Sequence, residues 1–257
     1  MERSSEPLSS ALATLQTRWG SAAVRLGDGR PVGSAAAAGD GAPTVHGALA
    51  LAVLPEPPPG APQPHGEAPA AGVISTGFPA LDAILGPSGL PQEASVVVRG
   101  GPSSGKTTLA LRCVAEAQAS GDIVAWLDLT RAFDPVEAVG RGVDLRWLLV
   151  IRPADVQEGL SLAGSLLSGR CVGLLVVDLP ARLRTRPDDR LRRLAAHARR
   201  VGARLMALEP TSMSSSFGPA LAQSTGLRLE LERRAWLRLG RDVVGQRTAV
   251  VVAKNRY

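Results

Sequence analysis

Apolar runs separated by helix-like stretches make up the middle of this chain. The runs lie at residues 94–99, 123–128, 147–151, 172–178 and 203–208. Near-continuous aliphatic runs of this length are typical of strands that are buried on both faces of a parallel sheet. Their alternation with helical stretches therefore predicts an α/β fold, in which helices cover both faces of a mainly parallel sheet.

The C-terminal part follows a different pattern. Leucines at positions 227, 229 and 231 alternate with charged residues, and a turn is expected near residues 240–245, which begin and end with glycine. Strict alternation predicts a strand with one buried face. We therefore expect an antiparallel hairpin that ends with a strand at residues 248–253.

The N-terminal part divides into two segments. Apolar residues from Leu8 to Leu26 approximate a helical stripe that Gly27 terminates, so one helix is expected within residues 1–28. Residues 29–72 are dominated by Ala, Gly and Pro, a composition that cannot bury a core and predicts a linker. The remaining segment, residues 73–257, has the length of one domain.

Composition limits the classes of protein to consider. Aromatic residues make up only 3% of the chain, so the core must be aliphatic. Its apolar runs are far shorter than the roughly 20 residues that a membrane-spanning helix needs. The two cysteines, with no recognisable secretory signal, favour a cytoplasmic protein. A formal net charge of +6 favours an acidic partner such as nucleic acid.

A phosphate-binding loop is the strongest motif in the chain. Residues 100–107 fit the pattern G-x-x-x-x-G-K-[ST], and they lie between an apolar run and a predicted helix at residues 109–119. Glycines let backbone N–H groups turn toward phosphates, and the N-terminus of a helix favours anions. The expected phosphate-binding residues are Gly100, Gly101, Pro102, Ser103, Ser104, Gly105, Lys106, Thr107 and Thr108.

The same motif predicts a metal site. Lys106, one of only two lysines in the chain, is expected to reach the β and γ phosphates of ATP, and the Thr107 hydroxyl is expected to coordinate Mg²⁺. Asp178 ends the aliphatic run at residues 174–178, as the acid of a Walker B strand does. We therefore expect Asp178 to share the Mg²⁺ with Thr107.

In order and spacing, these motifs resemble the RecA recombinase family, which implies a RecA-like P-loop NTPase core that binds ATP with Mg²⁺. The resemblance also implies filament-like homo-oligomers and contact with single-stranded DNA. In that family the N-terminal helix packs on a neighbouring subunit, and Lys254 and Arg256 match a pair that reaches the neighbour's nucleotide. The matching segments lie at residues 74–77, 81–82, 89–91, 100–108, 126–128, 134–135, 142–144, 174–178 and 252–256.

The chain departs from the family pattern at three functional positions. Thr130 stands where the family has the glutamate that activates the attacking water, and a hydroxyl is a poor general base. Glu137 stands opposite the adenine-stacking tyrosine, and Pro210 stands opposite the glutamine that senses the γ phosphate. We therefore expect ATP hydrolysis to be impaired or absent, with Asp128 and Glu137 as the remaining candidate bases.

The segments that match the DNA-binding loops of the family are shortened, but arginines gather after Asp178. Part of this region predicts a helix with an inward stripe that includes Leu191 and Leu194. Its arginines are either a solvated face in an arginine-rich chain or a contact surface for DNA phosphates or an acidic protein. The cluster comprises Arg182, Arg184, Arg186, Arg190, Arg192, Arg193, Arg199, Arg200 and Arg204.

Two functions remain open. The first is a nucleotide-binding accessory protein of DNA repair and the SOS response, acting with RecA or a translesion polymerase, as short RecA-like proteins of the ImuA type do. The second is an active single-stranded-DNA-dependent ATPase that forms filaments, which the intact phosphate loop and Asp178 favour. An unrelated P-loop kinase would need a lid and a substrate pocket, of which the sequence gives no sign.

Overall fold

The computed structural model describes residues 72–86, 88–181, 188–211 and 225–257. The predicted N-terminal helix at residues 1–28 and all but the end of the predicted linker at residues 29–72 lie outside this part of the chain. Within it, no helix is long and apolar enough to cross a membrane.

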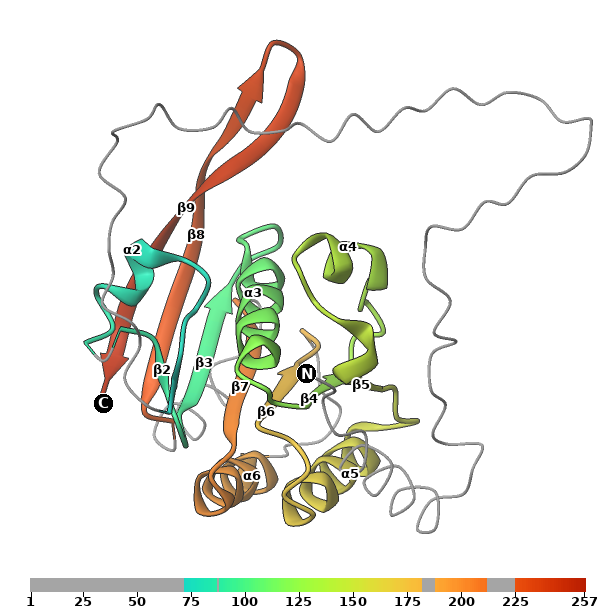
Figure 1. Cartoon of the computed structure of the whole chain (residues 1–257). Helices are drawn as coiled ribbons and strands as arrows, with labels where there is room; N and C mark the ends of the chain where they lie inside the picture. The colour runs from blue at the N-terminus through green and yellow to red at the C-terminus, as the bar shows by residue number, and fades with distance from the viewer. Residues whose placement is uncertain (1–71, 87, 182–187, 212–224) are drawn as a thin grey trace, which may run out of the picture.

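A seven-stranded sheet in the order β5-β4-β6-β7-β3-β8-β9 forms the centre of the fold (Figure 1). Every neighbouring pair is parallel except β8 and β9, which form an antiparallel hairpin. The predicted α/β class is therefore confirmed, with its mainly parallel sheet and C-terminal hairpin. The strands are β3 (Ser95–Gly100), β4 (Val124–Asp128), β5 (Leu148–Ile151), β6 (Leu174–Asp178), β7 (Arg204–Pro210), β8 (Leu227–Leu239) and β9 (Asp242–Asn255).

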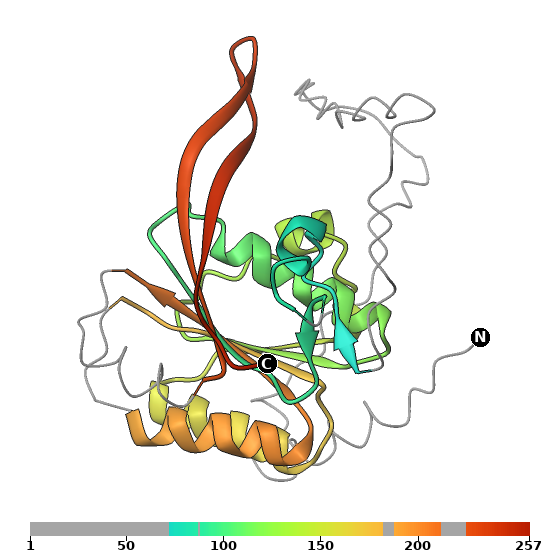
Figure 2. The same ribbon diagram turned by 90° about the vertical axis from the view of Figure 1, so that its left-hand side faces the viewer.

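Helices cover both faces of the sheet, as Figure 2 shows. One face carries α2 (Pro79–Asp82), α3 (Lys106–Ala119) and α4 (Pro135–Gly140), and the other carries α5 (Val156–Ser168) and α6 (Asp188–Val201). The remaining elements are β1 (Val73–Ile74), which pairs with β2 (Leu90–Pro91), and the short 3-10 helix η1 (Leu145–Trp147).

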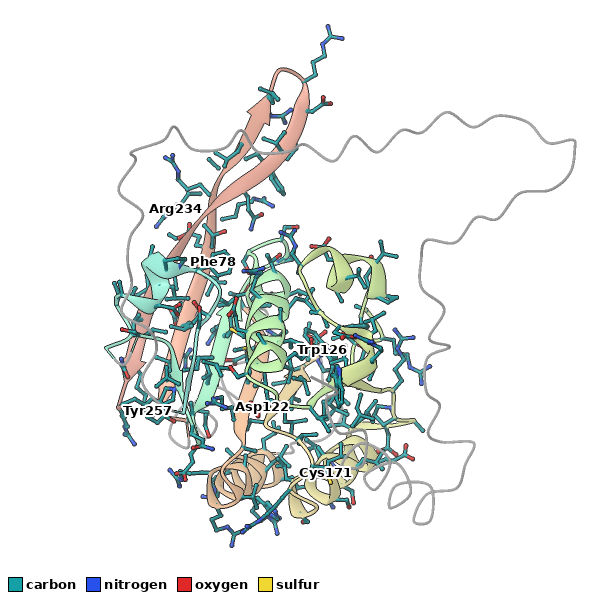
Figure 3. All side chains as sticks on the ribbon, viewed as in Figure 1. Phe78, Asp122, Trp126, Cys171, Arg234 and Tyr257 are labelled. Atoms are coloured by element: carbon teal, nitrogen blue, oxygen red, sulfur yellow. The ribbon has the colours of Figure 1, made fainter. Side chains whose placement is uncertain are left out.

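Alternate residues of each strand fill the two layers of core. In β3, Val96 and Val98 pack in the layer beside α3, whereas Val97 packs in the layer beside α5 and α6. Trp126 of β4, labelled in Figure 3, is fully buried in the first layer. Its ring centroid lies 5.3 Å from that of Phe133. Since successive strand residues point to opposite faces, an aliphatic run on each strand is what a sheet covered on both sides requires.

Helix α6 matches its predicted orientation. Leu191, Leu194, Ala195 and Ala198 are buried against the sheet. The arginines at positions 192, 193, 199 and 200 are exposed. The helical period thus separates an apolar side from a basic side, as the sequence indicated.

The hairpin is longer than the sequence predicted. β8 continues to Leu239 and β9 begins at Asp242, so only Gly240 and Arg241 form the turn. β3 ends at Gly100, which pairs with Leu231, and β8 then runs on beyond that point. The distal part of the hairpin therefore projects from the body of the fold (Figures 1 and 2).

Arg204 was expected to belong to the exposed basic cluster, and this expectation is wrong. Its side chain is buried, with Nη1 3.2 Å from Oδ2 of Asp122 and Nε donating to the Leu90 carbonyl. Burial raises the pKa of Asp122, and the guanidinium of Arg204 opposes that rise. Gly173, just before the intervening strand β6, provides the space, because a Cβ there would overlap the Asp122 carboxyl group.

Loss of this ion pair should destabilise the fold. We expect Arg204→Ala to lower the free energy of unfolding by about 3 kcal/mol, because it leaves the half-buried Asp122 carboxylate without its partner. Urea denaturation checks this, with Arg200→Ala as the control, because its exposed side chain should contribute less than about 0.5 kcal/mol. Equal effects of the two substitutions would contradict the role assigned to Arg204.

Candidate functional site

The phosphate loop connects the end of β3 to the start of α3. Gly100 is in register with Pro210 of β7 on one side and Leu231 of β8 on the other. A Cβ on Gly100 would lie 2.9 Å from the Leu231 carbonyl oxygen and would overlap the side chain of Ser104. Gly105 has φ of 94°, a conformation that favours glycine. The two end glycines of the motif are therefore required by space and by backbone conformation.

The start of α3 provides donors for an anion. Gly105 occupies the N-cap position and offers no side-chain cap, so the first N–H groups of the helix are available to a phosphate. The Oγ atom of Ser104 is buried and has no hydrogen-bond partner among the described residues. The uncapped N–H groups fit a bound phosphate group, whereas the Ser104 hydroxyl faces Gly100.

Lys106 brings a positive charge to this loop. Its Nζ atom donates to the carbonyl oxygen of Gly101 at 3.0 Å. Burial lowers the pKa of Lys106, and the negative charge of Asp178 opposes that change. Lys106 can therefore neutralise phosphate charge, while Asp178 and the exposed Thr107 can hold Mg²⁺ at the same edge of the sheet.

Thr130 donates a hydrogen bond to the carboxylate of Asp178. The Oγ1 atom of Thr130 lies 2.6 Å from Oδ2 of Asp178 and 3.2 Å from Oδ1 of Asp128. A hydroxyl has a single proton to donate, and the shorter distance assigns it to Asp178. Burial raises the pKa of Asp178, whereas the hydrogen bond from Thr130 lowers it.

Asp128 organises the loop that follows β4. Its buried carboxylate accepts hydrogen bonds from the backbone N–H groups of Ala132 and Phe133, at 3.0 and 3.2 Å. The Nε atom of Arg152 donates to it at 2.9 Å. These three donors hold the carboxylate of Asp128 to the loop after β4 and to Arg152.

Glu137, the other candidate base, lies exposed on α4. Its carboxylate accepts from the Nε atom of Arg141 at 2.7 Å, which is an i,i+4 pair along the helix. The neighbouring Asp134 caps α4 by accepting from the backbone N–H groups of Val136 and Glu137. The described geometry thus gives Glu137 a local partner on its own helix.

Lys254 and Arg256 lie away from the phosphate loop of their own chain. Lys254 pairs with Arg228, which is in register with Val97, three residues before Gly100. At about 3.3 Å per residue, this places Lys254 roughly 10 Å along the sheet from the start of the loop. Its Nζ atom donates to the Thr225 carbonyl at 2.6 Å.

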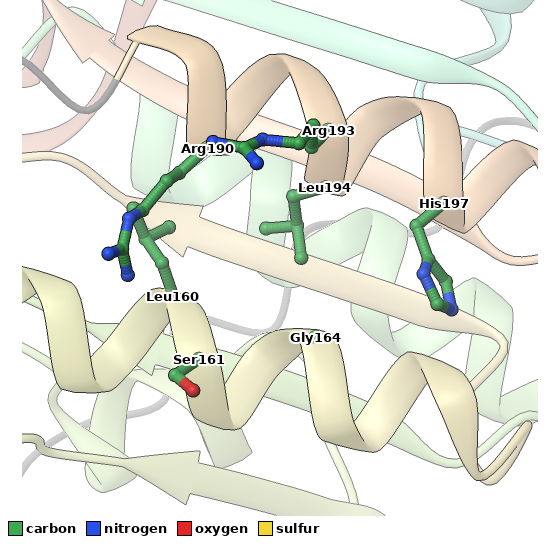
Figure 4. A pocket seen from close by; sticks show the side chains of 7 residues that line it. All are labelled: Leu160, Ser161, Gly164, Arg190, Arg193, Leu194 and His197. Atoms are coloured by element: carbon green, nitrogen blue, oxygen red, sulfur yellow. The ribbon is translucent and has the colours of Figure 1, made fainter.

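The basic surface of α6 is separate from the phosphate loop, because α6 and α3 cover opposite faces of the sheet (Figure 2). A groove of about 280 Å³ runs between α5 and α6, with Arg190, Arg193 and His197 on the α6 side (Figure 4). Ser161 and Gly164 line it from α5. Arg182, Arg184 and Arg186 of the predicted cluster lie outside the described residues.

Comparison with known proteins agrees with this geometry. Residues 65–215 match the family described as the RecA N-terminal domain. The chain belongs to the RecA family. It is 32% identical over 212 residues to the protein RecA of Chlorobaculum tepidum, which covers 72% of this chain and 61% of that protein. It is 36% identical over 213 residues to the protein RecA of Rhodococcus jostii, with the same two shares. The chain therefore spans about three fifths of the length of these relatives.

One buried carboxylate of this RecA-family chain escaped the sequence analysis. Glu209 lies at the end of β7, in register with Arg99 of β3, and its exposed fraction is 1%. Neither carboxylate oxygen has a hydrogen-bond partner among the described residues. Burial raises the pKa of Glu209, and the positive charges of Arg99 and Arg228 oppose this only in part. Only the sheet register reveals this environment, so the sequence carried no signal for it.

The raised pKa of Glu209 predicts a pH dependence of stability. The folded state holds the proton more tightly than the unfolded state, so this group's contribution to stability is lost as pH rises above 4.5, the ordinary value. Glu209→Gln should therefore be more stable than wild type at pH ~8, and the difference should shrink toward pH ~4.5. Thermal unfolding across this range checks it, and a difference independent of pH would contradict the assignment.

Proposed function

We propose that this chain binds ATP with Mg²⁺ at its phosphate loop and acts in DNA repair as a nucleotide-binding accessory protein that hydrolyses ATP slowly or not at all. The observation that carries the proposal is the hydrogen bond of 2.6 Å between Thr130 and Asp178. Thr130 occupies the position that the RecA resemblance assigns to a catalytic glutamate. A hydroxyl that donates to the metal-binding acid can help to orient it but offers no base for water.

Nucleotide binding would use groups that already converge. The backbone N–H groups at the start of α3 would donate to the phosphates, and the amine of Lys106 would exchange the Gly101 carbonyl for a phosphate oxygen. Thr107 and Asp178 would hold Mg²⁺, which would neutralise phosphate charge when bound. None of these interactions requires a base, so binding is compatible with slow turnover.

The described carboxylates around the site support slow hydrolysis. Asp128 is committed to the loop after β4 and to Arg152, Glu137 is paired with Arg141, and Asp178 is needed for the metal. General-base catalysis typically contributes a factor of about 10² to 10⁴ in rate. A chain without that base retains binding and loses this factor.

The partner follows from the resemblance. Short RecA-like proteins of the ImuA type are associated with mutagenic repair, and RecA or a translesion polymerase is the partner that this resemblance supports, within the SOS response. Lys254 and Arg256 lie on or beside the edge strand β9 and away from their own loop, which favours contact with the nucleotide of a neighbouring subunit. The second candidate is a single-stranded-DNA-dependent ATPase, favoured by the intact loop and by relatives that carry the name RecA.

Turnover measurements separate the two candidates. We expect purified wild-type protein, with or without single-stranded DNA, to release phosphate no faster than the Lys106→Ala control. Thr130→Glu should raise turnover by about tenfold or more, because it restores a carboxylate at the position of the family's base. Wild-type turnover that DNA stimulates and Lys106→Ala abolishes would establish the active ATPase instead.

Direct DNA contact through α6 predicts a specific salt dependence. If Arg199 and Arg200 each neutralise one phosphate of single-stranded DNA, their joint replacement by alanine should reduce the slope of log affinity against log salt by about 1.4. Replacing Arg238 and Arg241, near the hairpin tip, removes the same charge and serves as the control. Fluorescence anisotropy over a salt series measures both slopes, and equal slopes would show that α6 is a solvated face.

A further inference from the structure

The hairpin touches the phosphate loop through two side chains of β9. Oγ1 of Thr248 donates to the carbonyl oxygen of Ser104 at 3.3 Å, and Nε2 of Gln246 donates to Oγ1 of Thr248 at 3.0 Å. A Cβ on Gly105 would lie 3.0 Å from the same Nε2 atom. The loop is therefore in contact with the hairpin on the side where Ser104 exposes its carbonyl.

The direction of these hydrogen bonds fixes a peptide plane. The carbonyl of Ser104 and the N–H of Gly105 belong to one trans peptide and point in opposite directions. Because Thr248 holds the carbonyl toward β9, the N–H of Gly105 is turned away from β9. That N–H lies in the part of the loop that donates to a bound phosphate.

We propose that Thr248 and Gln246 are positioning residues for the phosphate loop, and that through them nucleotide binding is coupled to the hairpin. This inference rests on the proposed function, since it requires that the loop binds ATP. The Nε2 group of Gln246 can only donate, so it donates to Oγ1 of Thr248, and the Thr248 hydroxyl donates its own proton to the Ser104 carbonyl. The pair therefore stabilises one orientation of the peptide between Ser104 and Gly105.

An exposed tryptophan lies opposite Gln246 in the hairpin. Trp236 of β8 is the register partner of Gln246, is 45% exposed, and lies under the guanidinium of Arg233 at 4.4 Å. The ladder is irregular between Arg233 and Ala235, and irregularities of this kind bend a two-stranded ribbon. A movement of the loop would thus reach Trp236 and the exposed strands beyond it.

Binding of ATP with Mg²⁺, measured by calorimetry, tests the positioning role. Thr248→Val removes the donor to Ser104 without changing side-chain shape and should weaken binding about threefold to tenfold, the range for one hydrogen bond. Gln246→Glu should weaken it at least as much, because the Thr248 hydroxyl would turn to donate to the new carboxylate. Val243→Thr, the reverse exchange at an exposed position of the same strand, is the matched control and should bind as wild type does.

Tryptophan fluorescence tests the coupling. Saturating ATP with Mg²⁺ should change the emission of Trp236, identified as the part of the signal that Trp236→Phe removes, and Thr248→Val should reduce this change at equal nucleotide occupancy. Circular dichroism confirms that each variant is folded. If both Thr248→Val and Gln246→Glu bind ATP with wild-type affinity, or if bound ATP leaves the Trp236 emission unchanged, this inference is refuted and the proposed function is not. Absence of ATP binding by folded wild-type protein would refute the proposed function and this inference with it.

Discussion

The close fit of Gly100 between two neighbouring strands is the constraint on which the site depends. Pairing with Pro210 and Leu231 fixes where β3 ends. Because Gly100 has no Cβ, the side chain of Ser104 can pack directly over that end. The same pairing of strands sets Asp178 of β6 at the edge where Lys106 begins α3. The phosphate loop, Asp178 and the root of the hairpin are thus positioned by one sheet register.

In the proposed function, the charged groups at this edge of the sheet can bind ATP without hydrolysing it. Lys106 and Asp178 are half-buried opposite charges that each affect the other's pKa, and a phosphate with its metal would enter between them. Thr130 adds a hydrogen bond to Asp178 without adding a third carboxylate beside Asp128. In the proposed function, Thr130 in place of the family's glutamate leaves the groups for nucleotide binding in place and supplies no base for water.

The sequence predicted the sheet well because its signal is local. Each of the strands β3 to β7 matches its apolar run to within two residues, and the buried stripe of α6 follows from the helical period. The burial of Arg204 could not be predicted, because its partner Asp122 lies in the connection between α3 and β4 and the space comes from Gly173, just before β6. The contact of Thr248 with Ser104 likewise depends on a register between segments 144 residues apart. Local patterns gave the elements, and only the pairing of strands showed which polar groups meet.

The fate of bound nucleotide distinguishes a site that holds ATP from one that hydrolyses it. Protein loaded with one equivalent of ATP and Mg²⁺ is quenched with acid after increasing times, and the nucleotide is separated by ion-exchange chromatography. We expect the bound nucleotide to remain ATP over hours, with and without single-stranded DNA. Its conversion to ADP within minutes in wild-type protein, and not in Lys106→Ala, would contradict slow hydrolysis and show that the site contains a working base.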